Sequence, residues 1–269
     1  MKPRKGKVID CVQGSPGWWK ARRHIPTGSE FSSIIQAEKM SIEVPIEEAR
    51  YLDNGIRWQG VDLTTKQHAE LMADVAKATK ARKYARFTGY KASTGQAELM
   101  RRKLAASLGW ESQFKGTPAT ERGTLMEKEA RRWLAMEIGK RISEIGFVVS
   151  GCGRYGASPD GITEDGDPVE IKCPELPAFL KCADDGDVPN EYKAQVHGEM
   201  LVTGASRCWF VAYADSEYLD NVVIEVKRDD YTEALAHHLD RFCEELDIYR
   251  RRHLGDFYDE IFGEEDFAQ

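Results

Sequence analysis

The second half of the chain alternates short apolar runs with polar turns. Five runs rich in Val, Ile and Phe and bounded by turn residues are typical of β-strands: residues 142–151, 154–165, 167–173, 206–215 and 221–229. Helical patterns interrupt them around Pro177–Ala183 and from Glu191 to Val202. A last amphipathic helix is predicted from Asp229 to about Arg252. Its inward-facing positions are Leu235, Leu239, Phe242 and Leu246.

A longer helix is predicted before the strands, from near Thr120 to Ile138, and Gly139 ends it. Its predicted buried stripe consists of Leu125, Ala130, Trp133, Leu134 and Ile138. Near the N-terminus, the pattern predicts a short helix around Trp18–Arg23 and a second helix capped by Ser29.

The segment from Thr64 to roughly Arg86 has a helical pattern rich in Ala and Lys. A glycine-marked turn follows and another helix runs through Leu108, so this region is predicted to be an insertion of two helices. The order of elements predicts an α/β (α+β) core with a mixed central β-sheet flanked by helices. We expect one domain over residues 1–269, with the helical insertion at about 40–115 and an acidic tail at about 256–269.

The net charge limits how the protein can bind nucleic acid. Hydrophobic residues make up 41% and charged residues 31%, as in ordinary globular domains. The formal charge of −7 argues against a nonspecific, charge-driven coat for nucleic acid. The charge is uneven, however, because basic residues crowd the N-terminus and the stretch Lys77–Lys91, whereas the tail from Asp256 onward is acidic. A local basic groove is therefore compatible with the net charge.

The six cysteines form no CxxC pair, so neither a zinc ribbon nor a thiol redox motif is indicated, and the thiols are expected to be reduced. No apolar run approaches the length of a membrane span, and no apolar stretch follows the charged N-terminus. We therefore expect a soluble, cytoplasmic protein.

Two carboxylates and a lysine lie close together in SPDGITEDGDPVEIKCP, residues 158–174. Asp160 is in a Pro-Asp-Gly turn, and Glu170 and Lys172 lie two positions apart on a predicted strand, so both point to one face. An isolated ExK is usually a surface ion pair, and an isolated PDG is usually only a turn. The apolar neighbours Val169 and Ile171 place Glu170 and Lys172 on the opposite face, which favours one shared site.

Metal-dependent hydrolysis of a phosphodiester requires this set of groups. Mg²⁺ held by carboxylates supplies a nucleophilic water and neutralises charge on the phosphate oxygens. A lysine beside the carboxylates can orient or deprotonate that water, or stabilise the charge that develops on the phosphate. Glu127, on the preceding helix, is the natural third carboxylate. The residues alone predict a metal site with two carboxylates and a lysine.

Short motifs in three parts of the chain form an ordered set. SPDG, EIKCP and AQVHGEMLVTG follow one another, and WWKARRHIPTGSE and RGTLMEKEAR precede them. Together they resemble the lambda exonuclease or YqaJ-like viral recombinase family, within the PD-(D/E)xK nuclease superfamily. The resemblance covers about Gln13–Ile35 and Glu121–Asp215, whereas the stretch from about Glu38 to Phe114 contains no motif that can be placed. The fold that it implies is a restriction-endonuclease-like core.

The resemblance implies a metal site. Asp160 and Glu170 would be the principal ligands, joined by the main-chain carbonyl of Ile171, and Glu127 would be a further acidic group. The implied cofactor is Mg²⁺, with Mn²⁺ as a substitute and two ions in each active site.

It also implies roles for groups around the metal. Lys172 would act on the nucleophilic water, and Gln195 would hydrogen-bond near the lysine. A terminal 5′-phosphate would be bound by Arg22, Ser29 and Ser158. An arginine and hydroxyls near a helix N-terminus have the chemistry of a phosphate receptor.

Two positions depart from the family pattern. His197 stands where the family often has a second glutamine, and a structural role is favoured there over a metal contact. PTGS replaces ITAS, which keeps Ser29 but alters the entry to the helix. Alignment of the motif assigns Arg22, rather than Arg23, to the phosphate.

The implied activity is that of an exodeoxyribonuclease of the bacteriophage type. It would degrade the 5′-phosphorylated strand of linear double-stranded DNA from 5′ to 3′, leaving 3′ overhangs for a single-strand-annealing recombinase, and would form a homotrimeric ring around DNA. Two alternatives stay open: a restriction or repair endonuclease of the same superfamily, and a catalytically silent DNA-binding protein on the nuclease fold. An iron–sulfur nuclease is disfavoured, because no group of four cysteines flanks the motif.

Aromatic and basic side chains offer further contacts with DNA. Trp18 or Trp19 is the candidate for stacking on a base, whereas Trp133 and Trp209 are expected to be core residues. A lysine-rich helix at Lys77–Arg86 is usually a solvated face. If it lines a DNA groove, replacing its basic residues should weaken binding and flatten its salt dependence.

Overall fold

The computed structural model describes residues 5–36, 38–58, 61–91, 93–110 and 118–263. The chain divides into two compact units, one made of residues 1–32 and 105–237 and the other of residues 33–104 and 238–269. The expectation of one domain over the whole chain stays a prediction. Among the described helices, none is long and apolar enough to cross a membrane.

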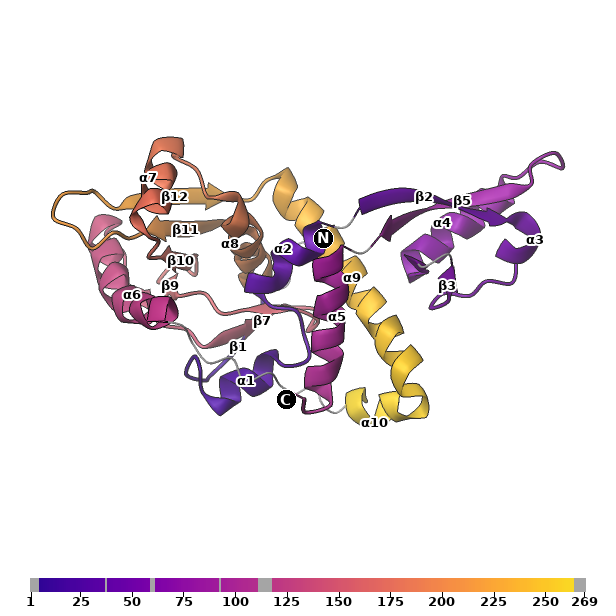
Figure 1. The fold of residues 1–269 in the computed structure, drawn as a ribbon, viewed down its shortest axis with the longest axis horizontal. Helices are drawn as coiled ribbons and strands as arrows, with labels where there is room; N and C mark the ends of the chain where they lie inside the picture. Colours follow the sequence, from indigo (N-terminus) through magenta and orange to yellow (C-terminus); the bar gives the residue numbers. More distant parts are fainter. Residues whose placement is uncertain (1–4, 37, 59–60, 92, 111–117, 264–269) are drawn as a thin grey trace. The chain divides into compact units, whose positions relative to one another are not determined.

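A five-stranded mixed sheet forms the core of the first unit (Figure 1), in the strand order β12-β11-β10-β9-β6. Its strands are β6 (Ile142–Ser143), β9 (Gly161–Thr163), β10 (Pro168–Lys172), β11 (Arg207–Ala212) and β12 (Val222–Lys227). β10 and β11 are parallel, and the other neighbours are antiparallel. This confirms the predicted α/β core with a mixed central sheet flanked by helices.

Helix α6 (Pro118–Glu137) packs on one face of this sheet. Ala130 and Leu134 are fully buried in a cluster with Val169 and Ile171 of β10. Leu125, predicted for the same stripe, is instead 77% exposed. It lies five positions before Ala130, which turns it about 140° away from the buried face. That part of the predicted stripe is wrong.

Helices α7 (Leu176–Asp185) and α8 (Asn190–Thr203) pack on the opposite face of the sheet. Phe179 of α7 and Met200 of α8 are buried in one cluster with Phe210 of β11. Every residue of α8 from Val196 to Thr203 is buried. Polar side chains in this interior stretch must therefore find partners inside the protein.

A smaller sheet supports the N-terminal segment. Its strands are β1 (Lys7–Ile9), β7 (Phe147–Val149) and β8 (Gly156–Ala157). Helix α1 (Pro16–Arg22) is capped by Ser15 and confirms the predicted short helix. The next turn, η1 (Gly28–Glu30), begins after Thr27, whose N–H and hydroxyl both donate to the Glu30 carboxylate. The cap is therefore Thr27 and not Ser29, because the helical turn begins one residue before Ser29.

A glycine in α8 lets the N-terminal segment approach closely. The ring of Phe31, the first residue of α2 (Phe31–Ile35), is fully buried, and a Cβ on Gly198 would lie 2.2 Å from it. The same approach brings Gly28 beside Gln195, where an added Cβ would lie 3.5 Å from Cγ of the glutamine. The segment that carries Arg22 and Ser29 is therefore fixed against α8.

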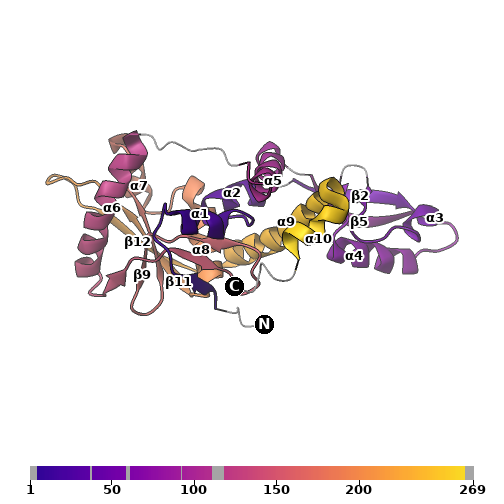
Figure 2. The ribbon, with the colours of Figure 1, turned by 90° about the horizontal axis from the view of Figure 1, so that it is seen from below.

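The second unit has its own small core under a pair of antiparallel strands (Figure 2), β2 (Glu38–Pro45) and β5 (Tyr84–Lys91). Val44 and Phe87 are buried there with Leu71 of α4 (Thr65–Ala76). The other elements of this unit are α3 (Ile46–Ala49), β3 (Arg57–Trp58), β4 (Val61–Asp62), η2 (Gly255–Phe257) and α10 (Tyr258–Phe262), with most of α5 (Thr94–Ser107) and of α9 (Asp230–Leu254). Residues 105–107 of α5 and 230–237 of α9 belong to the first unit. The four apolar positions predicted to face inward from α9 are all buried.

The region predicted as two helices contains α4 and α5 and also strands. The helix expected to reach Arg86 ends at Ala76, and β5 begins at Tyr84. Ala85 and Phe87 alternate with exposed residues and lie opposite Val44 and Ile42 of β2. Pairing with a distant strand overrides the helix preference of a segment rich in Ala and Lys.

Candidate active site

Asp160 lies in the turn between β8 and β9, beside the end of β10. Its Oδ2 accepts a 2.7 Å hydrogen bond from the N–H of Ile171. Its main-chain carbonyl accepts a 2.8 Å bond from Nε of Arg131 on α6. The Pro-Asp-Gly turn is therefore fixed to a strand on one side and to a helix on the other.

The main chain of β10 presents a carbonyl to this turn. The carbonyl of Lys172 accepts a 2.8 Å bond from the N–H of Tyr213, so it points toward the chain that continues β11. Successive residues of a strand point their N–H and C=O groups to opposite edges, and both groups of one residue share an edge. The carbonyl of Ile171 therefore faces the same edge as its N–H, toward Asp160. This placement suits the ligand role that the resemblance implies for it.

Glu170 and Lys172 form an ion pair on one face of β10. The Glu170 carboxylate is almost completely buried, and neither oxygen accepts a hydrogen bond of good geometry within the described residues. Nζ of Lys172 also lies 5.0 Å from the centroid of the Tyr192 ring, at cation–π distance. A buried carboxylate that relies on one ammonium group is poorly compensated.

The neighbouring carboxylates repel each other in a region with little water. Burial raises the pKa of Asp160 well above its usual range, and Glu170 raises it further. Burial also raises the pKa of Glu127 on α6; Arg131 partly opposes this, and Glu170 adds to it. These groups therefore form one acidic cluster that lacks enough positive charge.

Lys172 supplies the central positive charge of this acidic cluster. Burial by itself would lower the pKa of its ammonium group, but the nearby Glu170 and Asp160 outweigh burial, so that the pKa is raised. The lysine is therefore protonated at neutral pH and carries a positive charge beside the carboxylates. Of the roles left open by the sequence, charge stabilisation and orientation fit this state.

The donor set fits a divalent cation. Among the described residues, no three His, Cys, Asp or Glu side chains form a group that could hold a metal ion by themselves. Asp160, Glu170 and the Ile171 carbonyl are instead two carboxylates and one neutral oxygen, which suits a hard cation that keeps several waters. The Glu170 carboxylate, which relies on Lys172, and the raised pKa of Asp160 both indicate that added positive charge would be stabilising there.

Glu199 on α8 belongs to this cluster and was missed from the sequence. Its side chain is fully buried; Nε2 of Gln195 donates to Oε1 at 3.5 Å, and the Cys208 thiol donates to Oε2 at 3.7 Å. Burial raises its pKa well above the usual range, and Glu170 adds to the effect. A glutamate four residues after Gln195 in a mostly apolar helix was the available signal. Gln195 thus lies in the cluster, with Glu199 as its hydrogen-bond partner.

His197 points away from this acidic cluster. Nδ1 lies 2.7 Å from Oγ1 of Thr232 and 3.5 Å from Oδ1 of Asp229, and the ring is buried. Burial lowers its pKa, although Asp229 opposes this. These contacts favour the structural role over a metal contact.

Trp18 connects two of the residues predicted to bind a terminal phosphate. The Arg22 guanidinium lies 3.9 Å from the centroid of the Trp18 ring, and the indole N–H donates a 2.7 Å bond to Oγ of Ser158. Arg22 also donates a 3.0 Å bond to Oγ1 of Thr27, and burial lowers its pKa. Ser158 precedes Asp160 by two residues, so this group is continuous with the acidic cluster.

Ser29 is the third residue of the predicted phosphate set. It lies exposed in η1, beside the close approach of Gly28 to Gln195. Within the described residues, no hydrogen bond joins Ser29 to Arg22 or Ser158. The structure thus brings Arg22 and Ser158 together directly and places Ser29 on the adjoining turn.

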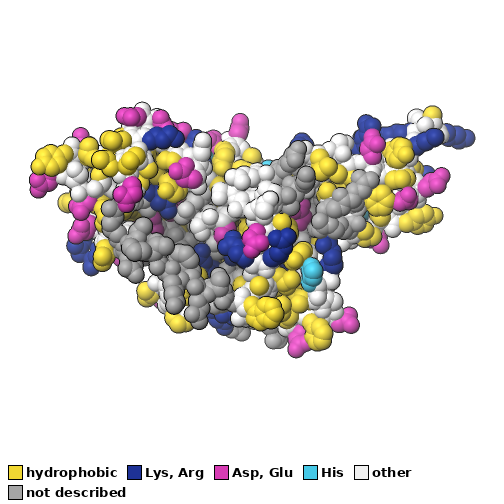
Figure 3. Space-filling view, in the orientation of Figure 1, with side chains coloured by type: hydrophobic (Ala, Val, Ile, Leu, Met, Phe, Trp, Pro, Cys, Tyr) yellow, Lys and Arg dark blue, Asp and Glu magenta, His cyan; other side chains and the backbone are white. Residues whose placement is uncertain are grey.

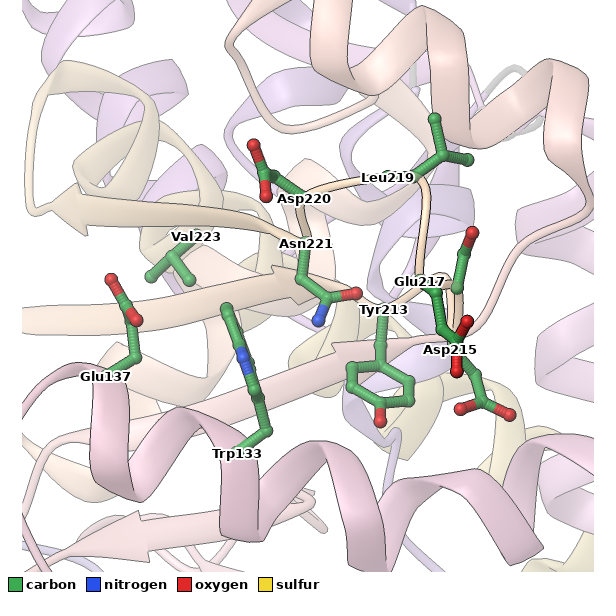
Figure 4. Close-up of a pocket in the computed structure, with 10 residues that line it drawn as sticks. Trp133, Glu137, Tyr213, Asp215, Glu217, Leu219, Asp220, Asn221 and Val223 are labelled. Carbon is green, nitrogen blue, oxygen red and sulfur yellow. The ribbon is translucent and has the colours of Figure 1, made fainter.

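A separate cavity of about 710 Å³ opens between α6 and the loop that follows β11 (Figure 4). Trp133 and Tyr213 line it, with their ring centroids 6.2 Å apart. Four carboxylates also line it: Glu137, Asp215, Glu217 and Asp220. None of its lining residues belongs to the site described above, so the cavity is separate from that site.

The chain is similar to known proteins in sequence and in fold. Residues 73–206 match the model of the YqaJ-like viral recombinase domain. No curated protein matches the chain.

Solved structures share its fold. An alkaline exonuclease (LHK-Exo) from Laribacter hongkongensis has a TM-score of 0.62 and 21% identity, over 89% of this chain and 96% of that chain. The same exonuclease in complex with dAMP has a TM-score of 0.62 and 22% identity, over 89% and 97%. A phage-related exonuclease from Haemophilus somnus 129PT, at 12% identity over 88% and 99%, has a TM-score of 0.48, which is too low to support an argument. The first two likenesses confirm the predicted nuclease-type fold.

Proposed function

The chain belongs to the family of YqaJ-like viral recombinase domains, and from this premise we propose that it is a deoxyribonuclease of the phage exonuclease type. It degrades the 5′-phosphorylated strand of linear duplex DNA from 5′ to 3′, with Mg²⁺, and leaves 3′ overhangs for a single-strand-annealing recombinase. The similar alkaline exonuclease was solved in complex with dAMP, a nucleoside monophosphate of the kind that an exonuclease releases.

One observation supports this proposal more than any other: the residues predicted to bind the terminal phosphate are continuous with the acidic cluster. Trp18 touches both Arg22 and Ser158, and Ser158 is covalently two residues from Asp160. A terminal phosphate bound by Arg22 and Ser158 would hold the next phosphodiester beside the carboxylates. Positioning of this kind supplies much of the rate enhancement in phosphate chemistry.

Each residue then has a chemical task. Arg22 and Ser158 bind and orient the terminal phosphate through charge and hydrogen bonds. The Lys172 ammonium group, protonated beside Glu170, orients water and stabilises the charge that develops on the scissile phosphate. Asp160, Glu170, the Ile171 carbonyl and Glu127 would hold Mg²⁺, which supplies Lewis acidity and a more acidic bound water.

The test is digestion of a linear duplex labelled at each 5′ end, with and without a terminal phosphate, in Mg²⁺ and then in Ca²⁺. We expect degradation in Mg²⁺ from phosphorylated 5′ ends, with no cleavage in Ca²⁺. Shortening of the strands while they keep their 5′ label, or equal rates without the phosphate, would contradict the proposed polarity or end recognition.

Two comparisons separate the alternatives. Closed circular duplex should resist cleavage, whereas rapid cutting of circles would identify an endonuclease. Lys172→Ala should abolish hydrolysis while Lys193→Ala, which removes a lysine ion-paired with Asp187, should not. Equal activity of wild type and Lys172→Ala would refute the assigned site.

The proposal extends to a ring-shaped homotrimer around the DNA end, as in the family. Sedimentation of the purified chain with and without duplex tests it. A monomer at concentrations that support processive digestion would refute the ring.

A further inference from the structure

We propose that the loop joining α4 to β5, residues 77–83, is a second DNA-binding surface that contacts the phosphate backbone of the substrate duplex through Lys77, Lys80 and Lys83. The inference rests on the proposed function in one respect, that DNA is the substrate. It adds a surface outside the acidic cluster and outside the residues predicted to bind the terminal phosphate.

The first support is the local charge. No Asp or Glu occurs between Asp74 and Glu98, although the whole chain has a formal charge of −7. Six basic residues fall in this interval: Lys77, Lys80, Arg82, Lys83, Arg86 and Lys91. Figure 3 shows dark blue side chains gathered over this end of the second unit. A positive patch on an acidic protein attracts a polyanion locally.

The second support is that the arginines of this stretch are ion-paired with nearby carboxylates, whereas the three lysines of the proposed surface form no such pair among the described residues. The Arg82 guanidinium forms a two-pronged ion pair with Asp74, which also accepts a 2.7 Å bond from the N–H of Arg86. The Arg86 side chain is ion-paired with Glu43 on β2. The carboxylates of Asp74 and Glu43 are thus used by arginines.

The three lysines are left without an ion pair in the described part of the chain, and all three are exposed. Lys77 follows the last residue of α4, where a positive charge is favourable to the helix dipole, and it also acts on Asp74 at longer range. That local explanation does not extend to Lys80 and Lys83. Three like charges within seven residues repel each other unless an anion binds them.

The third support is that the loop is held in place. The N–H of Arg82 donates to the carbonyl of Thr79 at 3.0 Å, and the carbonyl of Lys83 accepts a 3.0 Å bond from the N–H of Ile46. Below it, β5 and α4 pack into the buried core of the second unit. Lysines on a supported loop lose less freedom on binding than lysines on an unsupported chain.

The test is the salt dependence of duplex binding in EDTA, measured by fluorescence anisotropy between about 50 and 200 mM salt. Each duplex phosphate neutralised contributes about 0.9 to the slope of log K against log salt. The variant Lys77→Gln/Lys80→Gln/Lys83→Gln should bind more weakly, with a slope smaller by about 2 to 3. A slope equal to that of wild type would overturn the proposal.

A matched control removes the same charge elsewhere. Lys181, Lys227 and Arg141 are exposed and make only loose ion pairs, of 4.0, 3.9 and 3.7 Å. Changing all three to Gln should leave the slope within about 0.5 of wild type. An equal loss in both triple variants would show that net charge, and not the loop, is responsible, and would also overturn the proposal.

The failure of this inference differs from the failure of the proposed function. Hydrolysis of a phosphorylated duplex by wild type tests the function, whereas the two slopes test the loop. If wild type cleaves DNA and the loop variant keeps its slope, only the loop proposal is wrong.

Discussion

The N–H of Ile171 donates a 2.7 Å hydrogen bond to Oδ2 of Asp160, which joins the Pro-Asp-Gly turn to the strand that carries Glu170 and Lys172. Two motifs ten residues apart thereby become one site. The bond also stabilises the charged form of a carboxyl group whose pKa is raised by burial and by Glu170.

Asp160→Asn tests this relationship. The amide oxygen can still accept from Ile171, so the turn should keep its place while the negative charge is lost. We expect activity in Mg²⁺ to fall more than about 100-fold, beyond the effect typical of groups that only support a metal ligand. Wild-type activity in the variant would remove Asp160 from the site.

The same variant should change how the stability of the protein depends on pH. A carboxyl group whose folded pKa lies above its unfolded pKa destabilises the fold once the pH exceeds the unfolded value. Asp160→Asn should therefore unfold at higher urea than wild type at pH 8 without metal, and the difference should shrink toward pH 4. A variant less stable than wild type at pH 8 would contradict the assigned cause.

Trp18 and Ser158 should act as a pair in end recognition. Trp18→Phe removes the indole N–H and Ser158→Ala removes its acceptor, so each should reduce the preference for 5′-phosphorylated ends. The double variant should show a coupling of about 0.5–1.5 kcal/mol in that preference. Trp19→Phe, in an exposed ring 5.6 Å from Arg22, is the control with the smaller expected effect. Strict additivity of the Trp18 and Ser158 changes would rule out the pairing.

Gly198 should be intolerant of a side chain. A Cβ there would lie 2.2 Å from the Phe31 ring, so Gly198→Ala should lower the free energy of unfolding by about 1–3 kcal/mol. The control is Gly123→Ala on α6, where nothing lies within 4 Å of the added carbon. That change should stabilise the protein by about 0.5–1 kcal/mol. Urea unfolding measures both, and equal effects of the two changes would show that contact with Phe31 does not matter.

His197 should contribute to the pH dependence of folding. Burial lowers its pKa in the folded protein, so below about pH 6.5 the unfolded chain binds the proton more readily, and stability falls as the pH falls. His197→Gln should therefore lose less free energy of unfolding between pH 7 and pH 5 than wild type, because its side chain does not titrate there. His253→Gln, on the exposed end of α9, is the control. An unchanged pH profile in His197→Gln would contradict the structural role.

The parts of the fold that depend on local periodicity could be predicted from the sequence. Val169 and Ile171 alternate with Glu170 and Lys172, and this period of two identified both the strand and the face of the site. The apolar positions of α9 recur at helical spacing and are buried as predicted. In these segments, one buried face decides the local structure.

The remaining parts depend on partners distant in sequence. β5 is a strand because β2 lies beside it, and the sequence of Tyr84–Lys91 does not indicate which strand it pairs with. Glu199 stands in an apolar helix, and its place in the acidic cluster follows only once α8 packs on β10 and β11. The cap at Thr27 depends on where the turn begins, and a shift of one residue lies within the uncertainty of capping signals.

The parallel pairing of β10 with β11 has a consequence for folding order. Glu170 lies opposite Phe210, and the chain between these two residues forms α7 and α8. Contacts between residues this far apart in sequence form slowly, since the entropy of closing the crossover is lost before the strands gain their pairing. A nascent chain that stopped before Arg207 would already contain every carboxylate of the acidic cluster and its lysine. It would lack β11, the strand that pairs with β10 beside Glu170 and Lys172, so the site is complete only once Arg207–Ala212 has been synthesised.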